Sequence, residues 1–237
     1  TALNAYKGAH LILSVTEEIL SKYPDNLPKH LINHGLHHSF ITNYAPKEIN
    51  GSINVGMSGN WLRQDLDRNT IKEIITNHSN VNFECWGNME YDEKTIDSET
   101  IEFIQFLTNQ FNVKLHGIVN AKELAIAYQQ MDVFLICYDI QKDQSKGTNY
   151  HKVIEFLSTG RVVISNNISY YDTKPNLLEM SKSRIDNIEL PIIFNKVIKE
   201  ISSYNTTNKC ECRRNFALDN SYEKQLTKIK KLLNDVC

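Results

Sequence analysis

The sequence predicts an α/β fold: a doubly wound parallel β-sheet with helices on both faces. The first observation behind this prediction is the alternation of short apolar runs with longer amphipathic segments, which is typical of successive strand–helix–strand units. The second is that the apolar runs are nearly continuous. Strands that are covered by helices on both sides have this pattern.

The predicted elements follow one another along the whole chain. Strands are predicted for residues 53–57, 81–86, 113–117, 132–138 and 161–165, with a weaker strand near 177–181. Helices are predicted for residues 62–78, 98–111, 122–131, 150–160 and near 190–201, with a charged helix from about residue 220 to the end.

Local signals support these boundaries. The helix at 62–78 depends on apolar residues near helical spacing, among them Leu66, Ile71 and Ile75. Asp97 and Ser98 precede two glutamates and give the next helix an N-terminal cap signature. The glycine at 160 is a typical end for the helix at 150–160.

Composition and charge exclude several classes of protein. The 237 residues are 41% hydrophobic and 23% charged, as in ordinary globular proteins. A net charge of −2 gives no reason to expect a nucleic-acid partner. No apolar run is long enough to span a bilayer, and the start has no signal-peptide pattern. We therefore expect a cytoplasmic protein, and the opening "TALNAYKGAH" reads like the interior of a longer chain.

The five cysteines do not form a disulfide framework. Cys85 and Cys137 lie in apolar runs and are expected to be buried small residues in a reducing compartment. Cys210 and Cys212 could belong to a metal motif, but no second pair of ligands lies nearby in the sequence. A helix is the favoured interpretation of that segment.

Four histidines, at positions 30, 34, 37 and 38, suggest a zinc site at first sight. Ligation by His30 and His34 would need a helix, whereas Pro28 and Gly35 interrupt helical structure here. The favoured interpretation is a strand followed by a turn, and no metal site is predicted.

Parallel sheets bind ligands beyond the carboxyl ends of their strands, so the loops after the strands are candidate sites. After the first strand, Gly56, Ser58 and Gly59 could bring backbone N–H groups close to a phosphate. Arg63, expected one turn into the following helix, could add a charge-assisted bond. The alternatives are a simple tight turn and a solvated arginine.

Two further loops are candidates. After the third strand, Gly117, Ile118 and Val119 offer backbone against which a flat base could lie, although turn geometry alone also explains the glycine. After the fourth strand, Thr148 and Asn149 precede a helix whose N-terminus favours an anion.

Lys152 and Glu155 give the last loop its chemistry. Lys152 adds positive charge within the first turn, and Glu155 could accept from the two hydroxyls of a ribose. The alternative is an ordinary lysine–glutamate pair on a solvated helix.

At this point the sequence resembles a known family. "NYHKVIEFLSTGRVVIS" and "KLHGIVNAKELAIAYQQMDVFLICY" resemble segments of GT-B-fold glycosyltransferases of family 4, also called group 1. "INVGMSGNW", "RRNFALDNSYEKQLTKIKKLL" and "AHLILSVTEEIL" with "HLINHGLHHSF" match further segments in the same order. The resemblance spans nearly the whole chain and points to the Rossmann-like, nucleotide-sugar (donor) half of the fold.

The resemblance implies roles for individual residues. Glu155 matches the glutamate that holds the nucleotide ribose, and Asn149 and Lys152 match positions at the diphosphate and sugar end. Gly56 and Gly59 match the loop beside the phosphates, and residues 117–119 the backbone that reads the base. Two departures are Gly147, where retaining members often carry a second glutamate, and Arg161, where a proline is usual.

The resemblance also implies a domain organisation. Residues 1–40 would be the end of an acceptor-side domain and the segment crossing between domains, with Asn33 and Gly35 making the turn and Phe40 anchoring it. Residues 41–220 would be the donor-binding domain and residues 221–237 a C-terminal helix. The catalytic base would lie before residue 1, so the isolated chain is expected to be inactive.

The implied activity is metal-independent transfer of a sugar from UDP-sugar, or another nucleotide-diphosphate sugar, to a glycan or lipid acceptor. Bacterial surface-polysaccharide synthesis is the expected setting, with peripheral association at the inner face of the plasma membrane through the missing domain. No cofactor is expected. Two alternatives stay open: a nucleotide-sugar epimerase of the same fold, with His116 and His151 available, and a binding module without catalysis.

Overall fold

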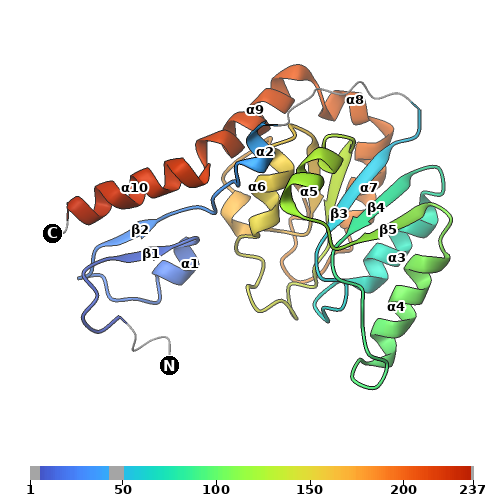
Figure 1. Ribbon diagram of the computed structural model, residues 1–237, viewed down its shortest axis with the longest axis horizontal. Helices are drawn as coiled ribbons and strands as arrows, with labels where there is room; N and C mark the ends of the chain where they lie inside the picture. The colour runs from blue at the N-terminus through green and yellow to red at the C-terminus, as the bar shows by residue number, and fades with distance from the viewer. Residues whose placement is uncertain (1–5, 43–50, 236–237) are drawn as a thin grey trace.

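The computed structural model describes residues 6–42 and 51–235, and its centre is a six-stranded, fully parallel sheet with the strand order β5-β4-β3-β6-β7-β8 (Figure 1). The strands are β3 (Asn54–Ser58), β4 (Asn82–Trp86), β5 (Val113–Gly117), β6 (Val133–Ile136), β7 (Val162–Ser165) and β8 (Glu179–Met180). The order reverses direction between β3 and β6. The predicted α/β class with a parallel sheet is confirmed.

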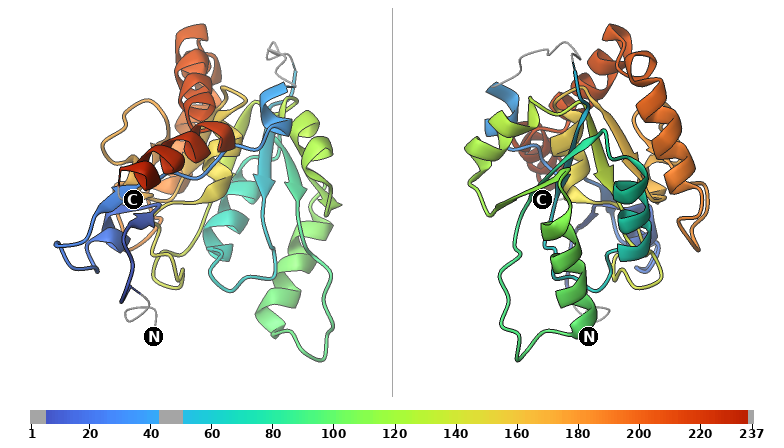
Figure 2. Two further views of the ribbon diagram at one scale, coloured as in Figure 1. Left: turned by 60° about the vertical axis from the view of Figure 1, so that its left-hand side comes forward. Right: turned by 90° about the vertical axis from the view of Figure 1, so that its right-hand side faces the viewer.

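Helices cover both faces of this sheet (Figure 2). One face carries α3 (Arg68–Asn77), α4 (Ser98–Asn109), α7 (Leu190–Lys199) and α8 (Ile201–Tyr204). The other face carries α2 (Ser39–Thr42), α5 (Ala121–Tyr128), α6 (His151–Leu157) and α9 (Thr207–Asp219). Because both sides are covered, every residue of β6 and β7 is buried, as their continuous apolar runs predict.

A smaller unit lies beside the main body. Its two strands, β1 (Ile12–Ser14) and β2 (Lys29–Leu31), pair in parallel around α1 (Glu17–Leu20). The last helix, α10 (Tyr222–Asn234), runs next to this unit, and the chain crosses to the main body at a bridge between Leu36 and Ser221 (Figures 1 and 2). The assignment of residues 1–40 to an acceptor-side domain stays a prediction.

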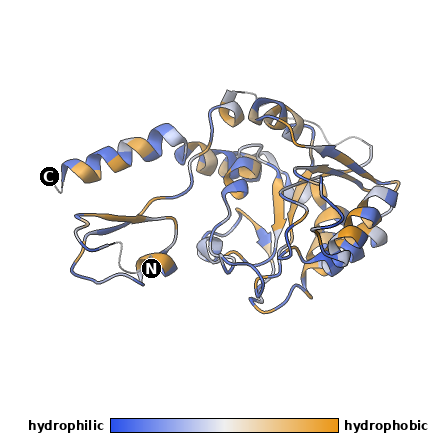
Figure 3. Cartoon of the chain, turned by 60° about the horizontal axis from the view of Figure 1, so that its bottom comes forward, coloured by the Kyte–Doolittle hydropathy of each residue, from blue (hydrophilic) through white to orange (hydrophobic). Residues whose placement is uncertain are grey.

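Apolar residues are concentrated on the central strands, whereas α10 alternates between apolar and polar residues around its circumference (Figure 3). A short 3-10 turn, Ser169–Tyr171, precedes β8. Within the described residues, no helix combines the length and the apolar character that crossing a membrane requires.

One predicted helix differs from the structure. The helix expected at 62–78 begins only at Arg68, because Asp67 accepts the Thr70 N–H as its cap and Leu66 forms a β-bridge with Tyr138. The charged helix predicted from about residue 220 to the end is present as α10, which the Ser221 side chain caps separately from the preceding α9. The remaining predicted elements are present, with ends shifted by a few residues.

The segments that contain the cysteines and the four clustered histidines have the structures that the sequence analysis favoured. Cys85 and Cys137 are buried thiols, and Cys210 and Cys212 lie in α9. The segment after β2 has no regular structure up to residue 35, and Phe40 of the following α2 is buried against Tyr128. Among residues 6–42 and 51–235, no group of three or more histidine, cysteine or acidic side chains is placed to hold a metal ion.

Candidate functional site

Three glycine-bearing loops lie side by side at the carboxyl ends of β3, β4 and β5. The Gly59 N–H donates to the Trp86 carbonyl at 3.0 Å, and the Gly87 N–H donates to the Gly117 carbonyl at 2.8 Å. A Cβ atom on Gly87 would stand 1.7 Å from the Gly59 carbonyl oxygen, so only glycine allows these backbones to approach. The loops therefore form one connected edge.

The loop after β5 continues this edge into solvent. Gly117 has a φ of +69° with open space around its missing Cβ, so its conformation rather than crowding requires glycine. Ile118 is 75% exposed, and Val119 is partly buried against the helices of the α5 face. The exposed Ile118 side chain is compatible with a flat ligand lying on this loop. The predicted base contact stays a prediction.

Gly56 has a different role from the predicted one. It lies inside β3 rather than in the loop, and a Cβ there would stand 2.6 Å from the Phe134 ring. Its missing side chain makes room for an aromatic ring of the core, which explains the glycine without a phosphate contact.

Lys152 reaches from α6 to the point where the strand order reverses. Its ammonium group donates to the Ser58 carbonyl at 2.5 Å and to the Tyr138 hydroxyl at 2.6 Å, and it lies 4.9 Å from the centre of the Tyr138 ring. The lysine thus joins the end of β3 to the end of β6. This edge is where parallel α/β sheets bind ligands.

Glu155 lies one turn further along α6, with only 16% of its side chain exposed. Burial raises its pKa to about 7, and the nearby Lys152 ammonium opposes that rise. Its nearest ionic partner is the His151 ring, with Nδ1 at 3.4 Å from Oε1. The alternative of a solvated lysine–glutamate pair is wrong, because both side chains point into the protein.

Arg63 is not on a helix, contrary to the prediction, because α3 begins only at Arg68. Its guanidinium forms two hydrogen bonds to Asp65 and lies 3.8 Å from Asp143. The bonded Asp65 carboxylate raises the pKa of Arg63 further above its ordinary value. The side chain remains 45% exposed, so one face of this fixed charge is open to solvent.

Asp143 organises the loop between β6 and α6. Its carboxylate accepts from the Ser145 hydroxyl at 2.5 Å, the Tyr150 hydroxyl at 2.7 Å and the Gly147 N–H at 3.0 Å. Burial acts to raise the pKa of Asp143, but these hydrogen bonds outweigh it and leave the pKa below its ordinary value. Sequence reasoning missed this residue, since one aspartate in a polar loop gives no periodic signal.

The same loop explains the departure at Gly147. Its φ is +62°, and a Cβ atom would stand 2.8 Å from the Asn167 carbonyl oxygen. A glutamate at this position would be strained and crowded. The second glutamate that the resemblance led us to consider at this position therefore has no room here.

Thr148 and Asn149 lie before the helix N-terminus and are buried. The Asn149 amide donates to the Asn33 side chain at 3.0 Å and to the Val15 carbonyl at 3.2 Å. Asn149 therefore holds residues 33–38, which run from the small unit to the main body and are called the crossing segment below, against the loop. The expected position of Asn149 at the diphosphate stays a prediction.

A cavity of about 480 Å³ opens above these residues. Its lining includes Arg63, Tyr138, Asn149 and Lys152 from the main body and His34 from the crossing segment. Sequence reasoning anticipated three of these residues. It missed Tyr138, because a tyrosine at the end of an apolar strand looks like part of the core.

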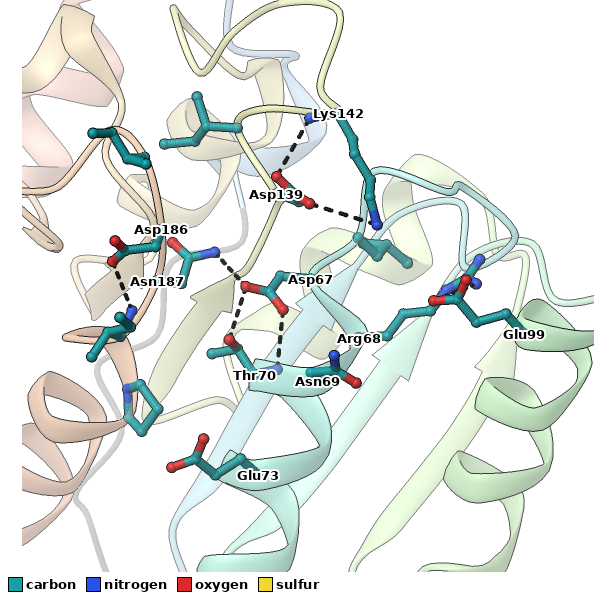
Figure 4. Close-up of a pocket in the computed structure, with 15 residues that line it drawn as sticks. Asp67, Arg68, Asn69, Thr70, Glu73, Glu99, Asp139, Lys142, Asp186 and Asn187 are labelled. Atoms are coloured by element: carbon teal, nitrogen blue, oxygen red, sulfur yellow. Dashed lines mark hydrogen bonds and ion pairs between the residues drawn. The ribbon is translucent and has the colours of Figure 1, made fainter.

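A second cavity, of about 410 Å³, lies at the N-terminus of α3 on the opposite face of the sheet. Figure 4 shows its acidic residues around Asp67, whose carboxylate accepts from Thr70 and from the Asn187 amide. The lining holds five carboxylates, Asp67, Glu73, Glu99, Asp139 and Asp186, but only two cations, Arg68 and Lys142. The lining charge disfavours a diphosphate.

No protein-family model and no curated protein sequence matches the chain. Several solved structures match it in fold. Pneumococcal O-GlcNAc transferase GtfA, in complex with UDP and GlcNAc, gives a TM-score of 0.66 at 16% identity, covering 99% of this chain and 46% of that one.

Two further structures are similar. Anabaena Alr3699/HepE in complex with UDP gives a TM-score of 0.73 at 13% identity, covering 99% of this chain and 66% of that one. Sucrose-phosphate synthase from Thermosynechococcus elongatus gives a TM-score of 0.69 at 12% identity, covering 95% of this chain and 57% of that one. The chain spans between about half and two thirds of these proteins. It has the fold of GT-B glycosyltransferases over nearly all of its length.

Proposed function

We propose that the chain is the nucleotide-sugar-binding half of a glycosyltransferase of GT-B type. The observation that carries this proposal is Lys152, a half-buried ammonium group at the point where the strand order reverses, beside a cavity large enough for a nucleotide. Pneumococcal O-GlcNAc transferase GtfA and Anabaena Alr3699/HepE, which have a similar fold, were each crystallised in complex with UDP. A nucleoside diphosphate is the ligand that this charge and cavity fit.

The contacts of the donor follow from the positions of the charges. Its diphosphate lies at Lys152 and the open face of Arg63, near the backbone at Ser58 and Gly59. Its ribose hydroxyls donate to Glu155, and its base lies on the backbone of residues 117–119. In this arrangement Glu155 is ionised when the ligand is bound, since only the carboxylate accepts from both hydroxyls.

Lys152 also stabilises the leaving group of the proposed reaction. As the sugar–oxygen bond breaks, negative charge develops on the leaving diphosphate, and the fixed ammonium group stabilises that charge more than it stabilises the bound donor. Lys152 is held by Ser58 and Tyr138 before the ligand arrives, so it needs no reorganisation during the reaction. We propose that this step needs no metal ion.

The finer parts of the proposal concern the whole protein. A second domain supplies the acceptor site and the base, and the acceptor is a glycan or a lipid-linked sugar. We place the protein in bacterial surface-polysaccharide synthesis, at the cytoplasmic face of the membrane, and in family 4. The chain alone binds donor but does not transfer sugar.

Calorimetric titration tests the proposal. The chain is titrated with UDP, GDP and their glucose derivatives at millimolar concentration, with uridine as the control that lacks phosphate. We expect weak binding of a nucleoside diphosphate and much weaker binding of uridine. If none of the diphosphates released or absorbed heat, the proposed site would be wrong.

A further inference from the structure

His151 lies where three distant parts of the chain meet. It is the first residue of α6, and its ring contacts the Glu155 carboxylate on the same helix. Its Nε2 atom lies 3.4 Å from the Tyr222 hydroxyl of α10. The His34 ring of the crossing segment stands against it edge to face, with ring centres 5.3 Å apart.

The joint around His151 is tightly built. A Cβ atom on Gly35 would stand 2.3 Å from the Tyr222 ring, so the ring of α10 rests directly on the backbone of the crossing segment. The Tyr222 N–H donates to the Leu36 carbonyl at 3.1 Å close by. A shift of His151 would therefore disturb both the crossing segment and α10.

We propose that His151 is a positioning residue that couples the donor-binding carboxylate of Glu155 to the joint formed by the crossing segment and α10. The inference rests on the proposed function, because it takes the ribose of a nucleoside diphosphate as the ligand of Glu155. Neither Lys152 nor Glu155 touches the joint by an ionic or hydrogen-bonding contact among those described, whereas His151 contacts both sides.

The charges around the pair explain how coupling works. Glu155 faces His151, Lys152 and the buried Tyr128 phenol, and His151 faces His34, Glu155 and Tyr222. Burial lowers the pKa of His151, and the Gly35 carbonyl opposes this. Ribose hydroxyls favour the ionised form of Glu155, and an N–H of His151 that donates to this carboxylate then binds more strongly. With that N–H on Nδ1, Nε2 is the acceptor for the Tyr222 hydroxyl, so the bond to Glu155 fixes the ring orientation in which His151 meets His34 and Tyr222.

The test uses three variants of the chain. His151→Leu keeps the site buried but removes the donor, His151→Gln restores a donor without the titrating ring, and His30→Leu repeats the first change at an exposed position on β2. UDP affinity is measured from pH 6 to pH 8, and hydrogen exchange of residues 33–38 is compared with and without UDP.

In the parent, UDP slows exchange at residues 33–38, and affinity rises with pH as Glu155 loses its proton. His151→Leu loses the protection, moves the midpoint of the pH profile upwards and weakens UDP binding by about fivefold. His151→Gln restores the midpoint, and His30→Leu behaves as the parent. Should His151→Leu fail to fold, Tyr222→Phe, which removes only the hydroxyl, is expected to lose part of the protection.

Two outcomes overturn the inference, and they are distinguishable. If the parent does not bind UDP, the proposed function fails and this inference fails with it. If the parent binds UDP but His151→Leu keeps both the protection and the pH midpoint, the coupling role is wrong while the donor site stands.

Discussion

The two cavities beside the carboxyl edge of the sheet are similar in size but opposite in charge. The cavity at α6 has about 480 Å³ and is lined by Lys152, Arg63 and two histidines, with Asp143 committed to its own loop. The cavity at α3 has about 410 Å³ and is lined mainly by carboxylates. Size alone would not separate them. Charge separates them, because a diphosphate gains Coulomb energy only in the first.

The comparison also shows how each helix start is used. At α3 the Asp67 carboxylate already caps the helix by accepting from the Thr70 N–H, and its negative charge stands at the helix N-terminus. At α6 no side chain caps the helix. The uncapped helix with a lysine in its first turn is the better anion site, which supports the proposed position of the donor.

Replacing Lys152 should have the largest effect on the difference between the two cavities. Lys152→Met keeps an unbranched side chain but removes the charge, and we expect UDP affinity to fall by about 10- to 100-fold, as for a lost charge-assisted hydrogen bond. Lys142→Met in the acidic cavity is the matched control and should leave the affinity unchanged. Calorimetry measures both, and equal effects of the two changes would contradict the assignment.

Glu155→Gln should separate stability from binding. The folded pKa of about 7 lies above the ordinary value of 4.5, so the unfolded state ionises first and the free energy of unfolding falls as pH rises from about 4.5 to about 7. The neutral amide avoids this loss. We expect the variant to gain roughly 2 kcal/mol in unfolding free energy at pH 8 and to bind UDP more weakly.

Denaturant unfolding at pH 5 and pH 8 checks the stability part. The gain should be small at pH 5, where most Glu155 side chains in the folded protein carry a proton. Glu73→Gln, an exposed glutamate of the acidic cavity, is the control and should not change stability at either pH. A gain at pH 5 as large as that at pH 8 would argue against a titrating Glu155.

Asp67→Ala affects the other cavity and should change stability without changing binding. The Asp67 side chain caps α3 and accepts from the Asn187 amide, so its loss should lower the free energy of unfolding by about 1–2 kcal/mol. Thermal unfolding measures this loss. UDP affinity at a temperature where the variant is folded should equal that of the parent.

Arg63→Gln should have the smallest effect of the four substitutions, a slight loss of UDP affinity. The guanidinium is already paired with Asp65 and is 45% exposed, so we expect UDP affinity to fall by less than about threefold at physiological salt. Titrations at low and high salt check this, because the difference between parent and variant should shrink as salt increases. A loss as large as that for Lys152→Met would make Arg63 a main phosphate contact.

The features that could be predicted depend on residues close together in the sequence, and those that could not depend on residues far apart. The strands were predictable because burial on both faces leaves continuous apolar runs, as in Val133–Ile136. The position of Lys152 and Glu155 on one helix was predictable from their spacing, whereas their roles towards a ligand stay predictions. Arg63 was misplaced because its loop is shaped by a bridge from Leu66 to Tyr138, far apart in sequence.

The sequence by itself determined the parallel sheet, its covering helices and the lysine and glutamate at the start of α6, since local periodicity and charge spacing are properties of neighbouring residues. Only the tertiary structure decided the rest. It buried Gly56 in the core, tied Asn149 to the crossing segment and gathered His34, His151 and Tyr222 into one joint. These contacts join residues that are distant in the chain, and spacing alone carries no information about them.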